Sequence, residues 1–273
     1  MHTPVLYEEA IKALEVKEGK KYIDATFGEG GHSKEILRWG GRVLGIEWDE
    51  NKVKSQKLKV KSYKNLKIVW GNFRNIEKIA KENDFFPVDG ILFDLGLSME
   101  QIGKSGRGFS FKNRSEPLDM RISQTLNRTA ADIVNSLSSR QLYEIFARNS
   151  EEINSWAIAQ AIFSARCLKK IETVEDLLAV VGEKESTLRR IFQALRIEVN
   201  QEFDNLREGL SGAINILKKK GRVVIITFHS LEDRIVKQFA RNNKLMFLTH
   251  KPIVAKNGKK FERSAKMRIF ALN

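Results

Sequence analysis

An apolar segment that runs into a glycine-rich turn, residues 21–32 (K-Y-I-D-A-T-F-G-E-G-G-H), constrains the fold of this chain more than any other stretch. Most residues in its first part are apolar, as in a buried strand. Gly28, Gly30 and Gly31 then allow the backbone to turn tightly and to lie against a ligand. Ser33 is placed to cap a following helix. Strand, glycine turn and helix together predict a nucleotide-cofactor site, although a purely structural turn has the same pattern.

The acid Asp24 precedes these glycines, and the turn reads G-E-G-G where dinucleotide-binding folds carry G-x-G-x-x-G. A carboxylate at this place suits a cofactor that carries a positive charge, because opposite charges attract. We therefore predict that Asp24, Gly28, Gly30 and Gly31 contact a cationic nucleotide cofactor.

Three further strand patterns follow, each with an acidic or aromatic side chain at or just beyond its carboxyl end. They are Arg42–Asp49 with Glu47, Leu66–Trp70 with Phe73, and Val88–Gly96 with Asp94. Strands that alternate with helical segments predict an α/β protein with a mostly parallel, Rossmann-like sheet. Ligands of such sheets bind beyond the carboxyl ends of the strands. We therefore expect Glu47 to hold ribose hydroxyls, Phe73 to lie along an adenine ring and Asp94 to face the reacting group.

The alternation stops after the fourth strand, and the chain from Lys104 to Met120 has the composition of a loop. In this loop Phe109 and Phe111 alternate with basic residues, a pattern that fits stacking on unpaired bases. Burial of both rings against a neighbouring domain explains the pattern equally well. Residues 125–196 have helical periodicity without a convincing strand, which predicts an inserted all-helical domain for substrate recognition.

A long helix is predicted over residues 187–218, where Arg196 and Asn200 share a face. The strand pattern then returns from Gly221 and ends at His229. Two short strand-like pieces around a basic N-G-K-K turn predict a terminal hairpin. The chain is therefore predicted to consist of a sheet domain in two parts and a helical insertion between them. The predicted bounds are 1–104, 105–196 and 197–273.

The charge of the chain favours a polyanionic partner. The sequence contains 48 Lys and Arg against 34 Asp and Glu, a formal net charge of +14, although a basic protein need not bind a polyanion. One cysteine excludes an internal disulfide, and the four dispersed histidines predict no metal site. The chain has no apolar run of membrane-spanning length and no signal-peptide pattern, so we expect a cytoplasmic protein without a membrane partner. The oligomeric state stays open, a homodimer included.

Three reaction classes can be compared on this arrangement. A nicotinamide-dependent oxidoreductase would explain the glycine turn and Glu47, but neither Asp24 nor the positive net charge. A serine hydrolase would need a G-x-S-x-G elbow, and Ser98 in G-L-S-M-E lacks the second glycine. A methyltransferase that uses S-adenosylmethionine fits best, because its sulfonium cation suits the acids near the glycine turn.

Six motifs, taken in order, resemble the bacterial 16S ribosomal RNA cytosine-N(4) methyltransferase family. They are D-A-T-F-G-E-G-G-H-S, D-L-G-L-S, R-G-F-S-F, P-L-D-M-R, F-Q-A-L-R-I-E-V-N and F-H-S-L-E-D-R-I-V-K. The resemblance covers nearly the whole chain and implies a class I S-adenosylmethionine methyltransferase fold. It also implies methylation of the exocyclic amine of one cytosine in the decoding region of the small ribosomal subunit. The chain departs from the family pattern at Glu47, where the family usually has Asp, and at Met99, where it usually has a second serine.

The resemblance further implies the roles of individual residues. Cofactor contacts would fall on Gly30, Gly31, His32, Glu47, Phe73, Asp94 and Gln101. The amine of cytosine attacks poorly until acceptors hold its N–H groups, so we expect Asp94 and Asp119 to supply such acceptors. Ser98 and His229 would line the same site, while a purely structural Asp119 that caps its loop remains the alternative.

The helical insertion would bind RNA through basic, aromatic and amide side chains. They are Arg107, Phe109, Phe111, Lys112, Arg114, Arg121, Arg196 and Asn200. The target base must be unpaired or flipped out of its helix before the amine can react. The alternative from another functional class is a non-catalytic RNA-binding or ribosome-assembly protein that retains the same fold.

Overall fold

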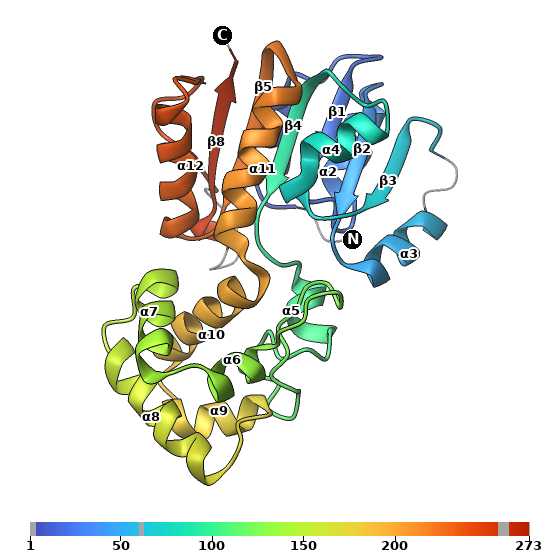
Figure 1. Ribbon diagram of the computed structural model, residues 1–273. Coiled ribbons are helices and arrows are strands. Elements are labelled where there is room, and N and C mark those ends of the chain that lie inside the picture. Colours follow the sequence, from blue (N-terminus) through green and yellow to red (C-terminus); the bar gives the residue numbers. More distant parts are fainter. Residues whose placement is uncertain (1–3, 60–62, 256–261, 273) are drawn as a thin grey trace. The chain divides into compact units, whose positions relative to one another are not determined.

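The computed structural model describes residues 4–59, 63–255 and 262–272 (Figure 1). The chain divides into two compact units. One, called here the sheet unit, comprises Met1–Gly96 and Phe203–Asn273, and the other, the helical unit, comprises Leu97–Glu202. The predicted boundaries at 104/105 and 196/197 therefore differ from the observed ones, because the helix that begins at Met99 and the last turn before Glu202 both belong to the helical unit.

The sheet unit is built on an eight-stranded sheet in the order β3-β2-β1-β4-β5-β8-β6, with β7 paired to β8. The strands are β1 Lys21–Asp24, β2 Arg42–Glu47, β3 Leu66–Trp70, β4 Val88–Asp94, β5 Leu217–Thr227, β6 Met246–Phe247, β7 Ile253–Val254 and β8 Lys266–Ala271. The first five strands pair in parallel, and β8 runs antiparallel to β5. The predicted α/β class with a mostly parallel, Rossmann-like sheet is confirmed. The predicted hairpin is confirmed as β7 and β8, and its N-G-K-K turn lies outside the described residues.

Helices cover both faces of this sheet. They are α1 Tyr7–Leu14, α2 Gly31–Arg38, α3 Glu50–Lys59, α4 Ile76–Glu82, α11 Glu202–Ile216 and α12 Ser230–Asn242, with the short 3₁₀ turns η1 Phe73–Asn75 and η2 Glu262–Ser264. On β4, Ile91 and Phe93 belong to the core under α4, α11 and α12, whereas Leu92 belongs to the core under α1 and α2. Side chains alternate between the two faces of a strand, so a strand buried on both faces is apolar throughout. That is why these strands read as continuous apolar runs.

The helical unit has its own apolar core. Its helices are α5 Met99–Lys104, α6 Ala130–Ser136, α7 Ser139–Ser150, α8 Ser155–Leu168, α9 Val174–Val181 and α10 Glu185–Asn200. Within residues 97–202, all of which the structure describes, there is no strand, so the all-helical insertion is confirmed. Because each unit buries its own cluster of apolar side chains, each has the packing of an independent domain.

The predicted single helix over residues 187–218 is wrong. Gln201 adopts a left-handed backbone conformation with φ 51°, which ends α10 and separates it from α11. The strand that follows begins at Leu217, earlier than the predicted start near Gly221, and its register against β4 shifts between Val88 and Gly90. Helical periodicity continues across Gln201, so the break could not be read from the apolar pattern.

Candidate functional site

The glycine turn after β1 has the shape that the sequence predicts. Gly28 and Gly30 have φ of 54° and 70°, which favours glycine. A Cβ atom on Gly30 would lie 2.6 Å from the ring of Phe27, and one on Gly45 in β2 would lie 2.3 Å from the same ring. The buried Phe27 ring thus fills the space under the turn, and glycine is required on both sides of it. Helix α2 begins directly after the turn, at Gly31.

Asp24 lies under this turn and stabilises its conformation. Its side chain is buried; Oδ2 accepts a hydrogen bond from the hydroxyl of Ser33 (2.7 Å), and Oδ1 accepts one from the N–H of Thr26 (3.3 Å). Burial raises the pKa of Asp24 to about 6, against the opposing effect of these hydrogen bonds. Ser33 therefore does not cap α2, whose N-cap is Gly30.

Glu47, at the end of β2, contacts the same turn. Its Oε2 accepts a hydrogen bond from the N–H of Gly28, and its Oε1 accepts one from the N–H of Asp49, both at 2.9 Å. Burial raises the pKa of Glu47, while the positive charge of Lys52 opposes the shift. Each carboxylate oxygen has a second lone pair, so the predicted contact with ribose hydroxyls is compatible with both hydrogen bonds.

Asp94 and His32 carry buried polar atoms without a hydrogen-bond partner among the described residues. These atoms are Oδ1 of Asp94 and Nε2 of His32, and the other oxygen and nitrogen of the two side chains lie 3.9 Å apart. The backbone N–H of Asp94 donates to the hydroxyl of Thr26 at 2.7 Å, which joins the end of β4 to the turn. Buried polar atoms are nearly always hydrogen-bonded, so two neighbouring residues that each carry an unpartnered buried atom indicate a place where a ligand binds.

The charge states of this pair follow from their burial. Burial, and then the negative charges of Asp24 and Glu232, raise the pKa of Asp94 to about 8. Burial alone lowers the pKa of His32 to about 4. At neutral pH the free protein therefore holds a largely protonated Asp94 next to a neutral His32. A bound cation would favour the ionised form of Asp94, so the site suits a positively charged group.

Phe73 lies just beyond β3, in η1, and is half-buried. Its ring meets that of Phe93 edge-on at 5.6 Å, and a Cβ on Gly209 of α11 would lie 2.7 Å from it. Part of the ring therefore packs against the core of the sheet unit. The predicted contact with adenine stays a prediction.

His229 is the N-cap of α12. Its Nδ1 accepts a hydrogen bond from the N–H of Glu232 at 3.4 Å, and its Nε2 lies 3.1 Å from Oε1 of that residue. Glu232 is 4% exposed, and its other oxygen accepts from the N–H of Phe228 at 2.9 Å. Sequence reasoning missed Glu232, although the spacing of His229 and Glu232 is that of a capping box.

Ser98 and Gln101 form a reciprocal capping box at the start of α5. The N–H of Gln101 donates to the hydroxyl of Ser98 (3.2 Å), and the N–H of Ser98 donates to the side-chain oxygen of Gln101 (3.0 Å). These contacts give both residues a structural role, and both belong to the helical unit. The other predicted cofactor residues belong to the sheet unit.

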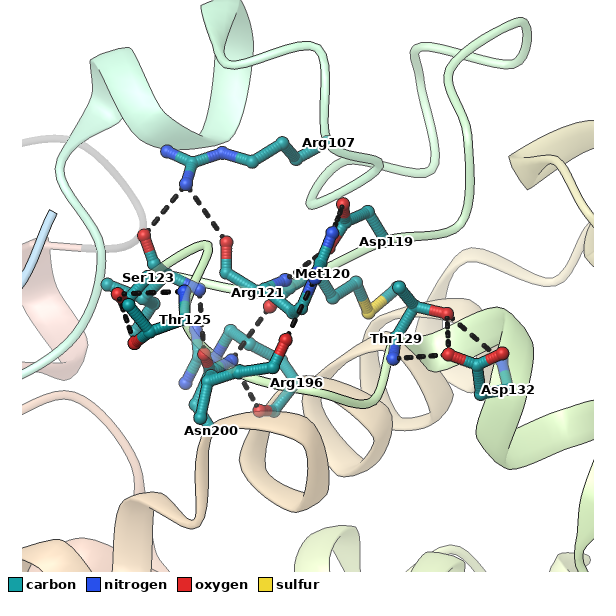
Figure 2. A network of polar contacts seen from close by, with 12 residues as sticks. Arg107, Asp119, Met120, Arg121, Ser123, Thr125, Thr129, Asp132, Arg196 and Asn200 are labelled. Atoms are coloured by element: carbon teal, nitrogen blue, oxygen red, sulfur yellow. Dashed lines mark hydrogen bonds and ion pairs between the residues drawn. The ribbon is translucent and has the colours of Figure 1, made fainter. Parts of the chain in front are cut away.

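Asp119 pairs with Arg121 in the loop that precedes α6 (Figure 2). The Nε and Nη2 groups of Arg121 donate to the two carboxylate oxygens at 2.8 and 2.9 Å. Partial burial alone would raise the pKa of Asp119, but the hydrogen bonds and the charge of Arg121 hold it below its ordinary value. Asp119 is therefore an ionised acceptor at neutral pH.

Several side chains that were predicted to bind RNA make intramolecular contacts instead. Phe109 is buried in the core of the helical unit, so the prediction that it stacks on a base is wrong, and Phe111 is half-buried with its ring edge-on to Phe192 at 5.8 Å. Arg196 forms a two-pronged ion pair with Glu202 at 2.8 and 3.0 Å. The alternative expectation for the two rings was burial against a neighbouring domain, but both rings pack within their own unit.

Of the other residues that were predicted to contact RNA, two are held by contacts within the protein and two are exposed. Arg107 donates to backbone carbonyl groups, and Asn200 is fully buried (Figure 2). Neither side chain therefore presents to RNA the free polar group that the sequence predicts. Arg114 is exposed but pairs with Glu175 and Glu183. Lys112 is exposed.

The part of the chain that the structure describes lacks two kinds of feature. No group of His, Cys, Asp and Glu side chains there could hold a metal ion. None of its helices is long and apolar enough to cross a membrane.

The sequence as a whole matches known proteins. A relative named ribosomal RNA small subunit methyltransferase H, from Thermomicrobium roseum, is 46% identical over 251 residues, which cover 88% of this chain and 77% of the relative. Proteins of the same name from Clostridium botulinum (strain Loch Maree) and Carboxydothermus hydrogenoformans are each 42% identical, over 86% and 89% of this chain and 80% and 81% of theirs. The model of the MraW methylase family matches residues 1–271. By these matches, the chain belongs to the MraW methylase family.

Proposed function

We propose that this protein transfers a methyl group from S-adenosylmethionine to RNA of the small ribosomal subunit, at the exocyclic N4 amine of a cytosine in the decoding region. Membership of a methylase family and relatives named for small-subunit ribosomal RNA support the reaction and the substrate class. The net charge of +14 is consistent with a polyanionic substrate. The six motifs support the cytosine amine as the acceptor, and a cytoplasmic location follows from this substrate.

The observation that carries the proposal is the group of acids around the glycine turn, of which Asp24 and Glu47 are buried and Asp94 is partly buried. Asp24, Glu47 and Asp94 lie at the carboxyl ends of β1, β2 and β4, and burial raises the pKa of each. Like charges that are kept out of water destabilise one another unless a cation joins them. S-adenosylmethionine fits this group, because it carries a sulfonium and an ammonium and supplies an activated methyl group. The unpartnered atoms of Asp94 and His32 would then gain a partner.

The residues of the chain have separate tasks in this proposal. Gly28, Gly30 and Gly31 allow close approach of the backbone, and Glu47 holds the ribose. Phe73 borders the adenine. Gln101 belongs to the cofactor contacts only by resemblance, since its side chain caps α5.

The amine of cytosine donates its lone pair into the ring and is a poor nucleophile until acceptors hold its N–H groups. We assign this role to the carboxylates of Asp94 and Asp119. Ser98 and His229 each cap a helix, α5 and α12, and a contact of either side chain with the substrate is part of the proposal. Orientation of the two reactants supplies most of the acceleration, up to roughly 7–11 kcal/mol.

The test is incubation with methyl-labelled S-adenosylmethionine and either naked 16S RNA or unmethylated small subunits, followed by mapping of the modified nucleotide. We expect one labelled cytosine, and the two substrates distinguish free RNA from the assembled particle. Asp94→Asn should abolish the label. The matched control is Asp84→Asn, at an exposed residue before β4 whose φ of 50° asparagine tolerates. A protein that binds the RNA but fails to bind S-adenosylmethionine in calorimetry would instead be a non-catalytic assembly protein.

A further inference from the structure

A strained backbone conformation separates Asp119 from Arg121. Met120 has φ 60°, in the left-handed region that residues with a Cβ rarely adopt. Its side chain is fully buried in the core of the helical unit. Strain of this kind persists only where the surrounding structure holds the backbone, and it gathers at functional sites. The contacts that hold the backbone at Met120 therefore indicate which side chains of this loop have a functional role.

Two side chains hold this backbone from either side (Figure 2). The amide of Asn200, which is fully buried, accepts from the N–H of Ile122 and donates to the carbonyl of Met120, both at 2.8 Å. Arg107 donates to the carbonyls of Arg121 and Ile122 at 3.0 and 2.7 Å. A carboxamide carries a donor and an acceptor together, so Asn200 can bind the peptide groups on both sides of Arg121. The backbone at Arg121 is thus held before any substrate arrives.

The pair that this backbone carries is partly exposed. The side chains of Asp119 and Arg121 are 20% and 24% exposed, and they join through two hydrogen bonds. A third N–H of Arg121 donates to the carbonyl of Leu126 at 2.8 Å. A guanidinium has five N–H groups and a carboxylate about four lone-pair positions, so the pair retains a donor and an acceptor next to each other.

We propose that Asp119 and Arg121 together read the Watson–Crick edge of the unpaired target cytosine, with Asn200 and Arg107 as positioning residues. The proposal rests on the proposed function and names the feature of the substrate that this loop recognises. Cytosine presents an amine donor beside a ring-nitrogen acceptor. The carboxylate would accept from the amine, and the guanidinium would donate to the ring nitrogen.

Uracil presents the opposite pattern at the same two positions, a carbonyl acceptor beside an N–H donor. Against uracil the carboxylate would face an acceptor, and the guanidinium would face a donor. The pair therefore discriminates between the two pyrimidines, whereas phosphate contacts elsewhere on the protein bind both equally.

The test compares two RNA hairpins that differ only in one unpaired nucleotide, cytidine or uridine, with binding measured by fluorescence anisotropy. The wild type should bind the cytidine hairpin about 5- to 150-fold more tightly, the range that a two-bond base contact supplies. Asp119→Asn should bring this ratio to within about twofold of unity, because a carboxamide can present either a donor or an acceptor. Arg121→Lys keeps the positive charge but loses the two-pronged geometry of the guanidinium, so it should lower this ratio of affinities in part.

Asn200 and Arg107, called here the clamp because they hold the backbone at Arg121, are tested by the same ratio of affinities for the cytidine and uridine hairpins. Asn200→Asp keeps the acceptor for Ile122 but loses the donor to Met120, and it should lower the ratio severalfold. Because a buried carboxylate destabilises the unit, Arg107→Met, at a half-exposed residue, is the second clamp variant. Glu144→Gln, in an exposed ion pair of α7, is the matched control and should leave the ratio unchanged.

The outcomes separate this inference from the proposed function. If the wild type methylates the small-subunit RNA but Asp119→Asn keeps the full preference for cytidine, the base-reading role is refuted and the methyltransferase proposal stands. If the wild type transfers no methyl group to any ribosomal RNA, the proposed function itself falls. A folded Arg107→Met protein with an unchanged ratio would remove Arg107 from the clamp.

Discussion

Binding of S-adenosylmethionine should release a proton from Asp94. Burial and the neighbouring negative charges of Asp24 and Glu232 raise the pKa of Asp94 to about 8, so the free protein holds this proton at neutral pH. A bound sulfonium or ammonium favours the ionised carboxylate. The affinity should therefore rise with pH until it passes the pKa of Asp94 and then level off.

The magnitude follows from the ionised fraction. With a pKa of about 8, roughly 1% of Asp94 is ionised at pH 6 and about 90% at pH 9, so the dissociation constant should be about 100-fold larger at pH 6. At pH 7 about 0.9 protons should leave for each molecule bound. The neutral His32, whose pKa of about 4 lies below this range, adds nothing to the change.

The assay is isothermal titration calorimetry from pH 6 to pH 9 in buffers with different ionisation enthalpies. Asp94→Asn mimics the protonated acid, so it should match the wild-type affinity at pH 6 and should lack the rise in affinity that the wild type shows toward pH 9. The amino group of the ligand titrates near pH 8 and contributes to both proteins alike. Asp84→Asn should follow the wild type. Equal pH profiles for the wild type and Asp94→Asn would refute the reasoning, because the linked proton would then belong to another group.

Three further outcomes are expected. Gly30→Ala, at φ 70° and with its Cβ 2.6 Å from the ring of Phe27, should lower the free energy of unfolding by roughly 1–3 kcal/mol in urea titration, whereas Gly103→Ala, which meets no atom within 4 Å, should not. Arg268 of β8 forms a buried, two-pronged ion pair with Asp233 of α12, at 2.6 and 3.0 Å. Arg268→Met leaves Asp233 buried and unpaired and should destabilise the sheet unit by about 3–5 kcal/mol in thermal unfolding. Burial would raise the pKa of Asp233, but Arg268 holds this pKa below its ordinary value. The stabilisation that the ion pair gives the wild type is therefore lost as the pH falls through the acid range. The variant lacks the ion pair, so its stability should not show this loss. Affinity for RNA should fall at least tenfold between about 50 and 200 mM salt in filter binding, and a flat salt dependence would contradict a phosphate-based contact.

Much of the sheet unit could be predicted from local sequence. The strands that carry Asp24, Glu47 and Asp94 were predicted, although two of them were predicted to run on to Asp49 and Gly96, two residues beyond their observed ends. Apolar runs, positive-φ glycines and capping spacings act within a few residues, so the chain encodes them directly. The same locality explains why the glycine turn and the acids beside it were recognised as one candidate site.

The sequence by itself thus determined the α/β class, the helical insertion and the acids at the strand ends. Only the tertiary structure decided which side chains of the insertion remain available. Phe109 became part of a core, and Asn200 binds the N–H of Ile122, 78 positions earlier in the chain. It also decided that Glu232 raises the pKa of Asp94 and that Gln201 ends α10. Contacts between distant segments arise from packing, so whether a basic or aromatic residue faces a partner or its own chain is settled only when the units fold.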